Sequence, residues 1–364
     1  MRAVIIGAGK VGYSLAQHLT EENHEVIVIE QDDARRAVIQ NNLDIMTVGG
    51  NGASPALLKT VAKDCDLLIA VTACDEVNML ACLNAKHVGV KRTIARVRSQ
   101  DYMGPDRWQL YERMGIDLAI NPEMVTAIEI SQTLFTPAAL DVEDFAGGKV
   151  RLLEVKVRPE SPFVNIPLKD LNLPRKILVA GILRHEKMII PHGSDVIKPN
   201  DSVFFVGENH VIKEFGNHFT TKRSRVERVL IIGAGRIGRH LAYLLEKRGL
   251  QVKVIDKQHS RCQELAKILK NSLVLCGDGT DIEFLAEEGA GNADAVVCLT
   301  DDDKLNLLIA LLAKHLGAQK TFVRVGRSEY IPLMEHVGVD VVLSPRLLTV
   351  GVILRQVRRG EIVA

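Results

Sequence analysis

The stretch Val4-Ile5-Ile6-Gly7-Ala8-Gly9-Lys10-Val11-Gly12 occurs again later in the chain, with few changes, as Leu230-Ile231-Ile232-Gly233-Ala234-Gly235-Arg236-Ile237-Gly238. Each copy is a short apolar run, expected to be a strand, followed by the glycine pattern G-x-G-x-x-G and a helix-forming segment. One such pattern is a weak signal. Two copies in one chain indicate a duplicated nucleotide-binding fold, because a solenoid would repeat at a much shorter period.

The correspondence between the copies continues well beyond the glycines, at an offset that drifts only from 226 to 228 residues. In both copies an acidic residue ends the second expected strand, 18 residues after the third glycine. The matched pairs are Glu30 and Asp256, Asn51 and Asp278, Thr72 and Thr300, Asp75 and Asp303, Asn78 and Asn306, and Arg96 and Arg324. The copies therefore share a whole domain and not only a motif.

The composition of the 364 residues restricts the class of protein. Apolar residues make up 47% of the chain and aromatic residues only 4%, as expected for parallel strands that helices cover on both faces. The formal net charge of +1 provides no general basic field for nucleic acid. Apolar runs are strand-length, well short of the roughly 20 residues of a membrane span, and no signal-peptide pattern is present. We expect a soluble, cytoplasmic protein, whose six cysteines form no C-x-x-C pair and are ordinary reduced thiols.

The alternation of strand and helix patterns predicts an α/β protein with two doubly wound, Rossmann-like parallel sheets. We expect the first nucleotide-binding domain over residues 1–136 and the second over residues 226–364, where a final helix follows Ser344-Pro345-Arg346. Between them, residues 137–220 contain short apolar strands separated by Gly and Pro turns, which predicts a small α+β lobe. A locally basic linker is expected over residues 218–228.

The glycine patterns predict two sites for a dinucleotide or mononucleotide. The first glycine permits the tight strand-to-helix turn, the second lets the backbone approach a pyrophosphate, and the third lets helix and strand pack closely. The helix N-terminus that follows then holds the phosphates. The predicted loop residues are Gly7, Gly9, Lys10, Val11 and Gly12 in the first site and Gly233, Gly235, Arg236, Ile237 and Gly238 in the second.

Acidic and polar residues at the expected carboxyl edge of each sheet complete the two sites. Glu30 and Asp256 are predicted to bind ribose hydroxyls, and their charge disfavours the 2′-phosphate of NADP. Asn51 and Asp278, with Gly279, are either ligand contacts or simple turn residues. Thr72 and Thr300 are expected to face the crevice. Lys10, Arg236, Arg96 and Arg324 are candidates for neutralising a phosphate, or are solvent-facing charges, and Asp75 and Asp303 are expected to be helix N-caps.

No catalytic group is evident beside these sites. A dehydrogenase needs a proton-transfer group and a substrate lobe next to the nicotinamide, whereas His185 and His192 of the middle lobe lie in turn-like contexts. Two binding sites without a catalytic constellation favour sensing over turnover. An NAD-dependent oxidoreductase remains the alternative. A transcription factor that senses NADH would need a basic helix-turn-helix segment, which the sequence does not show.

The order of these motifs resembles the TrkA-type regulators of potassium uptake, whose domains are called RCK or KTN. The resemblance rests on Thr72-Ala73-Cys74-Asp75-Glu76-Val77-Asn78, on Ala95-Arg96-Val97-Arg98-Ser99, on Asn121-Pro122-Glu123 and on the middle lobe. It implies a non-enzymatic peripheral protein on the inner face of the plasma membrane that binds NAD or NADH, with ATP or ADP as alternative ligands.

The same resemblance implies that the chain forms an oligomeric ring and gates a membrane potassium-conducting subunit of the Trk or Ktr type. The helices after Asn121 and Ser344 would then build assembly contacts. One departure is that a second copy of the regulatory lobe, expected after the second nucleotide domain, is missing from this sequence. The first loop, with Lys10 and Asn51, matches the family pattern less closely than the second, so the two sites are open to different nucleotides.

Overall fold

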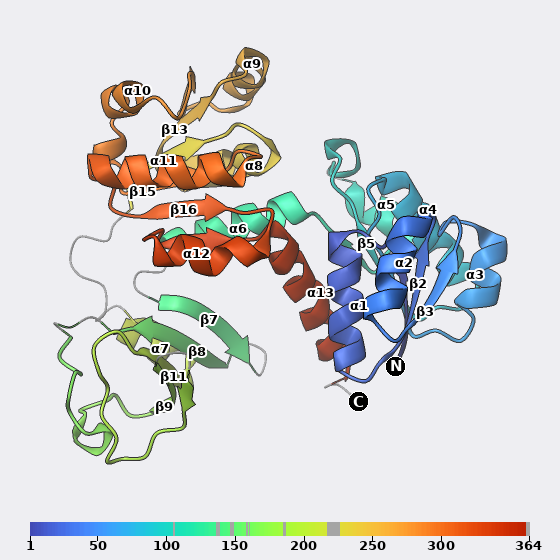
Figure 1. Ribbon diagram of the computed structural model, residues 1–364, viewed down its shortest axis with the longest axis horizontal. Coiled ribbons are helices and arrows are strands. Elements are labelled where there is room, and N and C mark those ends of the chain that lie inside the picture. The colour runs from blue at the N-terminus through green and yellow to red at the C-terminus, as the bar shows by residue number, and fades with distance from the viewer. Residues whose placement is uncertain are drawn as a thin grey trace. The chain divides into compact units, whose positions relative to one another are not determined.

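The computed structural model describes residues 1–104, 106–135, 139–145, 149–157, 159, 161–184, 187–216 and 226–361. The chain divides into two units, one of Met1–Ile128 with Arg228–Ala364 and one of Glu129–Glu227. The first unit holds both predicted nucleotide folds, and the second holds the small lobe (Figure 1). The predictions for His185 and for most of the basic linker concern residues outside the described ones.

The first nucleotide fold is a parallel sheet of six strands in the order β3-β2-β1-β4-β5-β6. Its strands are β1 (Arg2–Ile6), β2 (Glu25–Glu30), β3 (Met46–Gly49), β4 (Leu67–Ala70), β5 (Arg92–Arg96) and β6 (Leu118–Ile120). Its helices are α1 (Lys10–Glu21), α2 (Asp33–Asn42), α3 (Pro55–Val61), α4 (Asp75–His87), α5 (Arg107–Arg113) and α6 (Pro122–Phe135). The strand order reverses between β1 and β4, which is where ligands bind in open α/β sheets.

The second nucleotide fold repeats this topology in the order β14-β13-β12-β15-β16-β17. Its strands are β12 (Arg228–Ile232), β13 (Gln251–Asp256), β14 (Leu273–Cys276), β15 (Ala295–Cys298), β16 (Thr321–Arg324) and β17 (Val341–Leu343). Its helices are α8 (Arg236–Lys247), α9 (His259–Ile268), α10 (Ile282–Glu287), α11 (Asp303–Leu316), α12 (Ile331–His336) and α13 (Pro345–Glu361). The predicted pair of Rossmann-like sheets is confirmed.

The third glycine of each pattern belongs to the buried stripe of the helix that follows it. In α1, Gly12, Leu15, Ala16 and Leu19 are buried, and in α8 the equivalent residues Gly238, Leu241, Ala242 and Leu245 are buried. This spacing of three and four residues places all four on the helix face that packs against the sheet. Central strands such as β4 and β15 are buried at every position, as helices on both faces of the sheet require.

Helix α13 of the second nucleotide fold packs against α1 of the first, and the two lie side by side in Figure 1. Val350, Ile353, Leu354 and Val357 of α13 join the apolar core of the first fold. The guanidinium of Arg92 also donates to the Gln356 carbonyl at 2.9 Å. Helix α13 therefore follows the second nucleotide fold in the sequence, but its apolar side chains complete the core of the first.

The small lobe is an antiparallel sheet in the order β10-β9-β11-β8-β7. Its elements are β7 (Ala139–Phe145), β8 (Val150–Lys156), β9 (Ile177–Arg184), β10 (Lys187–Ile189), β11 (Ser202–Glu208) and α7 (Asn209–Gly216). Helix α7 packs Phe215 against Phe205 of the sheet, with ring centroids 5.0 Å apart. A small α+β lobe is confirmed, although the sequence did not predict β7 or α7.

No helix within the described residues is both long and apolar enough to span a membrane. All six cysteines are free thiols; Cys65, Cys82, Cys262 and Cys298 are buried and Cys74 and Cys276 are exposed. Burial raises the pKa of the Cys82 thiol to about 12 and also raises that of Cys298, so both stay protonated near neutral pH.

Candidate nucleotide-binding sites

The first glycine loop joins β1 to α1 in a conformation that requires glycine. Gly7 has a φ of 101°, in the left-handed region that side chains rarely adopt, and its N–H donates to the Ile29 carbonyl at 2.9 Å. A Cβ atom at Gly12 would lie 1.8 Å from the Gly7 carbonyl oxygen. By contrast, a Cβ atom at Gly9 would meet nothing within 4 Å, so this glycine leaves open space above the loop.

The second loop, between β12 and α8, has the same geometry. Gly233 has a φ of 112° and donates to the Ile255 carbonyl at 2.7 Å. A Cβ atom at Gly238 would lie 1.9 Å from the Gly233 carbonyl oxygen, whereas at Gly235 nothing would lie within 4 Å. The two loops thus keep the same division of roles, with the first and third glycines serving the fold and the middle glycine open to a ligand.

Both helices that follow the loops begin without a capping side chain. Gly9 and Gly235 are the N-cap residues of α1 and α8, and neither helix has an acidic residue in its first turn. The N–H groups of the first turn and the positive end of the helix dipole are therefore open to an anion. Lys10 and Arg236 stand at the first position of each helix, and Lys10 is exposed to solvent.

The two predicted ribose acids are held in place by the glycine loops. Glu30 accepts the N–H of Ala8 at 2.6 Å, and Asp256 accepts the N–H of Ala234 at 2.7 Å. Asp256 also accepts the N–H of Gln258 at 2.8 Å. Both acids also line the cavity described below, and their role in binding ribose hydroxyls stays a prediction.

Asn51 and Asp278 form turns of the kind that the sequence left open as an alternative. The side chain of Asn51 accepts the N–H of Ala53 at 3.0 Å. The carboxylate of Asp278 accepts both the N–H and the hydroxyl of Thr280, at 2.9 and 2.8 Å, and these bonds lower its pKa. Each side chain thus has a structural partner, and Asp278 also lines the cavity described below.

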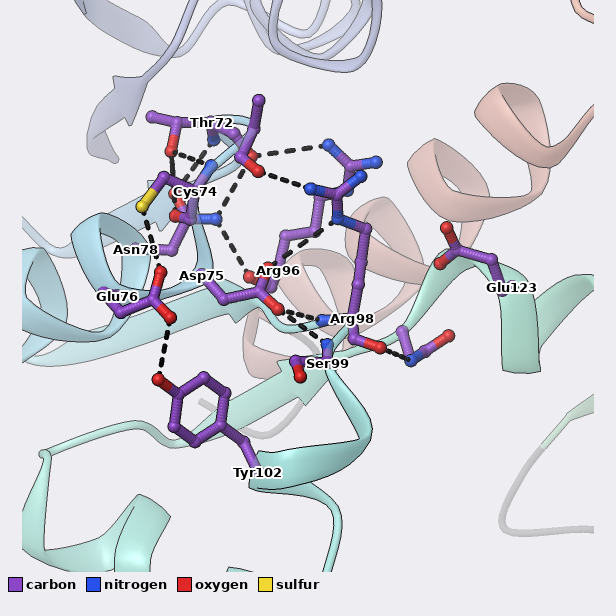
Figure 2. A network of polar contacts seen from close by, with 12 residues as sticks. Thr72, Cys74, Asp75, Glu76, Asn78, Arg96, Arg98, Ser99, Tyr102 and Glu123 are labelled. Atoms are coloured by element: carbon purple, nitrogen blue, oxygen red, sulfur yellow. Dashed lines mark hydrogen bonds and ion pairs between the residues drawn. The ribbon is translucent and has the colours of Figure 1, made fainter. Parts of the chain in front are cut away.

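A buried asparagine organises the end of each sheet, and sequence reasoning gave it no role. Asn78 has no exposed surface. Its amide oxygen accepts the Thr72 hydroxyl at 2.7 Å, and its amide nitrogen donates to the Arg96 carbonyl at 2.9 Å (Figure 2). Asn306 binds Thr300 and Arg324 in the same way, at 2.6 and 3.0 Å. The paired recurrence of Asn78 and Asn306 in the sequence was the signal that could have identified this role.

The prediction that Asp75 and Asp303 are helix N-caps is wrong. Cys74 is the N-cap of α4 and Asp302 is the N-cap of α11. The carboxylate of Asp75 instead accepts the backbone N–H groups of Arg98 and Ser99, both at 2.7 Å (Figure 2). Asp303 accepts the N–H of Gly326 at 2.7 Å. Each aspartate therefore ties the start of its helix to the turn after the neighbouring strand.

The arginines that end β5 and β16 have different surroundings in the two folds. Arg324 donates to the Thr300 carbonyl at 2.7 Å and lies 3.3 Å from the Asp301 carboxylate. Arg96 donates to the Thr72 carbonyl at 3.4 Å. Burial lowers the pKa of the Arg96 guanidinium, and the nearby charge of Arg98 adds to this effect.

The two glycine loops line a single cavity of about 1250 Å³ within the first unit. All predicted site residues line it except Gly12, Asn51 and Gly238. Arg236 of the second fold lies 3.6 Å from the carboxylate of Glu123 of the first. Among the described residues no group of three or more His, Cys, Asp or Glu side chains could hold a metal ion. The duplicated sites therefore share one cavity, whose wall includes residues of both folds.

Solved structures with a similar arrangement of elements include the GsuK RCK domain and the GsuK channel. The crystal structure of the GsuK RCK domain matches 99% of this chain and 77% of its own, with a TM-score of 0.71 and 19% identity. The GsuK channel bound to NAD matches 99% of this chain and 64% of its own, with a TM-score of 0.72 and 18% identity. These likenesses concern the fold alone.

Sequence relatives and family models agree with one another. The TrkA-N domain model matches residues 3–122 and 229–345, and the TrkA-C domain model matches residues 152–220. A Trk system potassium uptake protein trkA homolog of Methanosarcina mazei is 43% identical over 98% of this chain and 89% of its own length. The Trk system potassium uptake protein TrkA of Halomonas elongata is 36% identical over 100% of this chain and 80% of its own. The chain therefore belongs to the TrkA family, with two TrkA-N domains on either side of a TrkA-C domain.

Proposed function

We propose that this chain is a nucleotide-binding regulatory subunit of a potassium uptake system, and not an enzyme. The observation that carries the proposal is the pair of complete glycine loops facing one cavity, each with its own acid and helix N-terminus. The names of the TrkA relatives support a role in potassium uptake. The partner would be a membrane potassium-conducting subunit of the Trk or Ktr type.

The proposed ligands are NAD or NADH, with ATP or ADP as alternatives. Each site offers a carboxylate for ribose hydroxyls and a helix N-terminus for phosphates, which all four ligands carry. The same carboxylates disfavour a 2′-phosphate. The GsuK structures bound to NAD and to ADP, which share this fold, support both ligand classes.

Regulation would follow from the shared cavity. A ligand shifts a conformational equilibrium only if it binds one arrangement better than the other. Because residues of both folds line the cavity, a nucleotide that contacts both would favour the arrangement in which they are close. We propose that a homo-oligomeric ring transmits this change to the potassium-conducting subunit, with the chain peripheral on the inner face of the plasma membrane.

Calorimetric titration of the purified chain with NAD, NADH, ADP and ATP tests the proposal. Glu30→Arg is expected to weaken binding at the first site at least tenfold, and Asp256→Arg is expected to do the same at the second site. Affinity at the other site should be unchanged. Binding that survives both substitutions would contradict the site assignment. Consumption of NADH with a carbonyl substrate would instead favour an oxidoreductase.

A further inference from the structure

Two cysteines of the second nucleotide fold lie together beside the predicted ribose acid Asp256. Cys262 is a buried residue of α9, and Cys276 is the exposed last residue of β14. Helix α9 packs against β14, and Cys276 lies opposite Asp256 of the neighbouring strand β13. The fold therefore brings both thiols to the end of the sheet at which the second site is predicted.

The sulfur atoms of the pair contact the same pieces of backbone. The Sγ atom of Cys262 lies 3.3 Å from the Asp256 carbonyl oxygen and 3.4 Å from the Leu275 carbonyl oxygen. The second of these oxygens belongs to the peptide group that joins Leu275 to Cys276. The Sγ atom of Cys276 lies 3.8 Å from the carbonyl oxygen of Lys257, the residue that follows Asp256. Both thiols thus contact carbonyls of consecutive residues after β13, and Cys262 also reaches the backbone of Cys276.

The two thiols also interact with each other. Burial raises the pKa of the Cys262 thiol, and the neighbouring Cys276 thiol adds to this through its charge and through a hydrogen bond between the side chains. Cys262 therefore stays protonated near neutral pH. Cys276 is the exposed member of the pair, so it is the thiol that a reagent in solution can reach.

The first nucleotide fold shows how directly these two positions face each other. Its equivalents of Cys262 and Cys276 are Arg36 of α2 and Gly49, the last residue of β3. A Cβ atom added to Gly49 would lie 2.0 Å from the Arg36 guanidinium. A side chain at the helix position therefore occupies the space next to the strand position.

The fold does not require thiols at these positions, because the first copy has an arginine and a glycine there. A metal site does not account for the pair either. Among the described residues no group of three or more His, Cys, Asp or Glu side chains could hold a metal ion. Two thiols whose Cβ atoms can approach to about 3.5–4.5 Å can form a disulfide, and this chemistry uses both members of the pair.

The pair adjoins the backbone that shapes the second nucleotide site. The Asp256 carbonyl that Cys262 contacts also accepts the N–H of Gly277 at 3.1 Å. Asp256, Lys257 and Gly277 all line the larger cavity. A disulfide would draw the two sulfur atoms to about 2.0 Å and would remove the thiol hydrogen that lies against these carbonyls. Such a change must shift α9 relative to β14, and with them the residues that line the cavity.

We propose that Cys262 and Cys276 are a redox-active pair, which a low-molecular-weight disulfide such as oxidised glutathione converts to a disulfide. We further propose that this disulfide weakens nucleotide binding at the second site, because the reduced form is the one in which Asp256 is held by the glycine loop. The effect on binding rests on the proposed function above, whereas formation of the disulfide does not.

The oxidation consists of two thiol–disulfide exchanges. The Cys276 thiolate attacks one sulfur atom of oxidised glutathione, which forms a mixed disulfide and releases one glutathione. The Cys262 thiol then loses its proton to water, and its sulfur attacks the Cys276 sulfur. This step forms the Cys262–Cys276 bond and releases the second glutathione, which takes up a proton. Two protein thiols are thus oxidised, and one glutathione disulfide is reduced to two thiols.

Incubation of the full chain with oxidised glutathione, followed by peptide mapping with mass spectrometry, tests the redox pair. Every protein carries Cys74→Ser, which removes the second exposed thiol. The chain that retains both members should give a cross-linked peptide that dithiothreitol separates. Cys276→Ser, an exposed substitution, should give no cross-link. Cys262→Ser should stop at the mixed disulfide of Cys276, and thermal unfolding checks that each variant folds.

Calorimetric titration with NADH tests the effect on binding. In the same Cys74→Ser background, Glu30→Arg leaves the second site and Asp256→Arg leaves the first. Oxidation should weaken NADH binding at the second site by about fivefold or more, reversibly with dithiothreitol, and should leave the first site unchanged. Addition of Cys276→Ser should make the second site insensitive to oxidised glutathione.

The outcomes separate this proposal from the proposed function. If the chain that retains both cysteines forms no cross-link, the redox pair is overturned, while NADH binding still supports the nucleotide sites. A cross-link that leaves the NADH affinity of the second site unchanged overturns the effect on binding. A cross-link in a chain that binds no nucleotide supports the redox pair and contradicts the proposed function.

Discussion

At the scale of single residues, the middle and third glycines of the second loop should separate binding from folding. Gly238→Ala places a Cβ atom 1.9 Å from the Gly233 carbonyl oxygen, so helix and strand must move apart, at a cost of about 1–3 kcal/mol. Gly235→Ala meets nothing within 4 Å. We expect Gly238→Ala to lower the midpoint temperature of thermal unfolding and Gly235→Ala to leave it unchanged. Calorimetric titration should find weaker NADH binding in both variants. Equal stability of the two variants would contradict this division of roles.

A second prediction at this scale concerns the buried asparagine at the end of the first sheet. Asn78→Ala removes the hydrogen bonds of the Asn78 amide to the Thr72 hydroxyl and the Arg96 carbonyl. A buried polar group that is left unsatisfied costs about 1–3 kcal/mol. Asn84→Ala, in the same helix, loses a single bond to the Ala53 carbonyl and is the milder control. Hydrogen exchange should show β4 and β5 losing protection in the first variant only. Unchanged protection would mean that Asn78 does not hold the site together.

Residue chemistry that depends on local spacing was predictable, and chemistry that depends on distant partners was not. The glycine roles follow from the spacing of the pattern, because each glycine answers a local steric demand. The error at Asp75 arose because an aspartate at a helix start can accept N–H groups of its own first turn or of a distant turn. The structure shows the second choice, in which Asp75 accepts N–H groups of residues 98 and 99.

At the scale of elements, helix α13 should stabilise the first nucleotide fold although it belongs to the second. Leu354 is 4% exposed and lies in the core of the first fold. Leu354→Ala is expected to cost about 2–5 kcal/mol. Leu347→Ala, at a site that is 39% exposed in the same helix, should cost much less. Hydrogen exchange should find the loss of protection in β1 and α1; a loss confined to β12 and α8 would contradict the packing.

The small lobe offers a pH-dependent prediction. Burial raises the pKa of the Asp201 carboxyl, but its hydrogen bonds from Arg184 and Lys198 outweigh this and hold the pKa below its usual value. A lowered carboxyl pKa contributes stability above the usual value of about 4, which is lost as the pH falls through the lowered pKa. Asp201→Asn should therefore reduce hydrogen-exchange protection of β11 at neutral pH. Its difference from the parent chain should shrink below about pH 4, whereas the exposed Asp170→Asn should match the parent throughout.

Element type and order were predictable for the nucleotide folds because apolar runs and glycine turns alternate regularly. Strand β7 was missed because Ala139–Phe145 carries three acidic residues in seven, so apolar and polar residues alternate only from Leu140 to Glu143. The partner of α13 could not be predicted either. An apolar stripe at a spacing of three and four residues indicates that one face of a helix is buried. Which surface buries that face depends on the tertiary structure and not on the local sequence.

At the scale of the whole molecule, the glycine loops of the two duplicated folds line one cavity. Sequence predicted two sites, and the fold class follows from the repeat. That both loops line one cavity depends on how the two folds pack, which no local pattern encodes. The facing arrangement matters because ligands that share a cavity can influence one another through the same charges, here Arg236 of the second fold and Glu123 of the first.

We therefore predict that the two nucleotide sites are coupled. Saturation of one site should change the affinity of the other by about fivefold or more, and the effect must be the same in both directions. Glu123→Gln removes the charge that lies 3.6 Å from Arg236 and should reduce this coupling, whereas Arg113→Gln should leave it unchanged. Calorimetric titration of NADH with and without saturating ADP, using the Glu30→Arg and Asp256→Arg variants to assign each site, measures the coupling. Equal affinities in the presence and absence of the other ligand would show that the shared cavity holds two independent sites, and the regulatory proposal would then need a different route from nucleotide to membrane subunit.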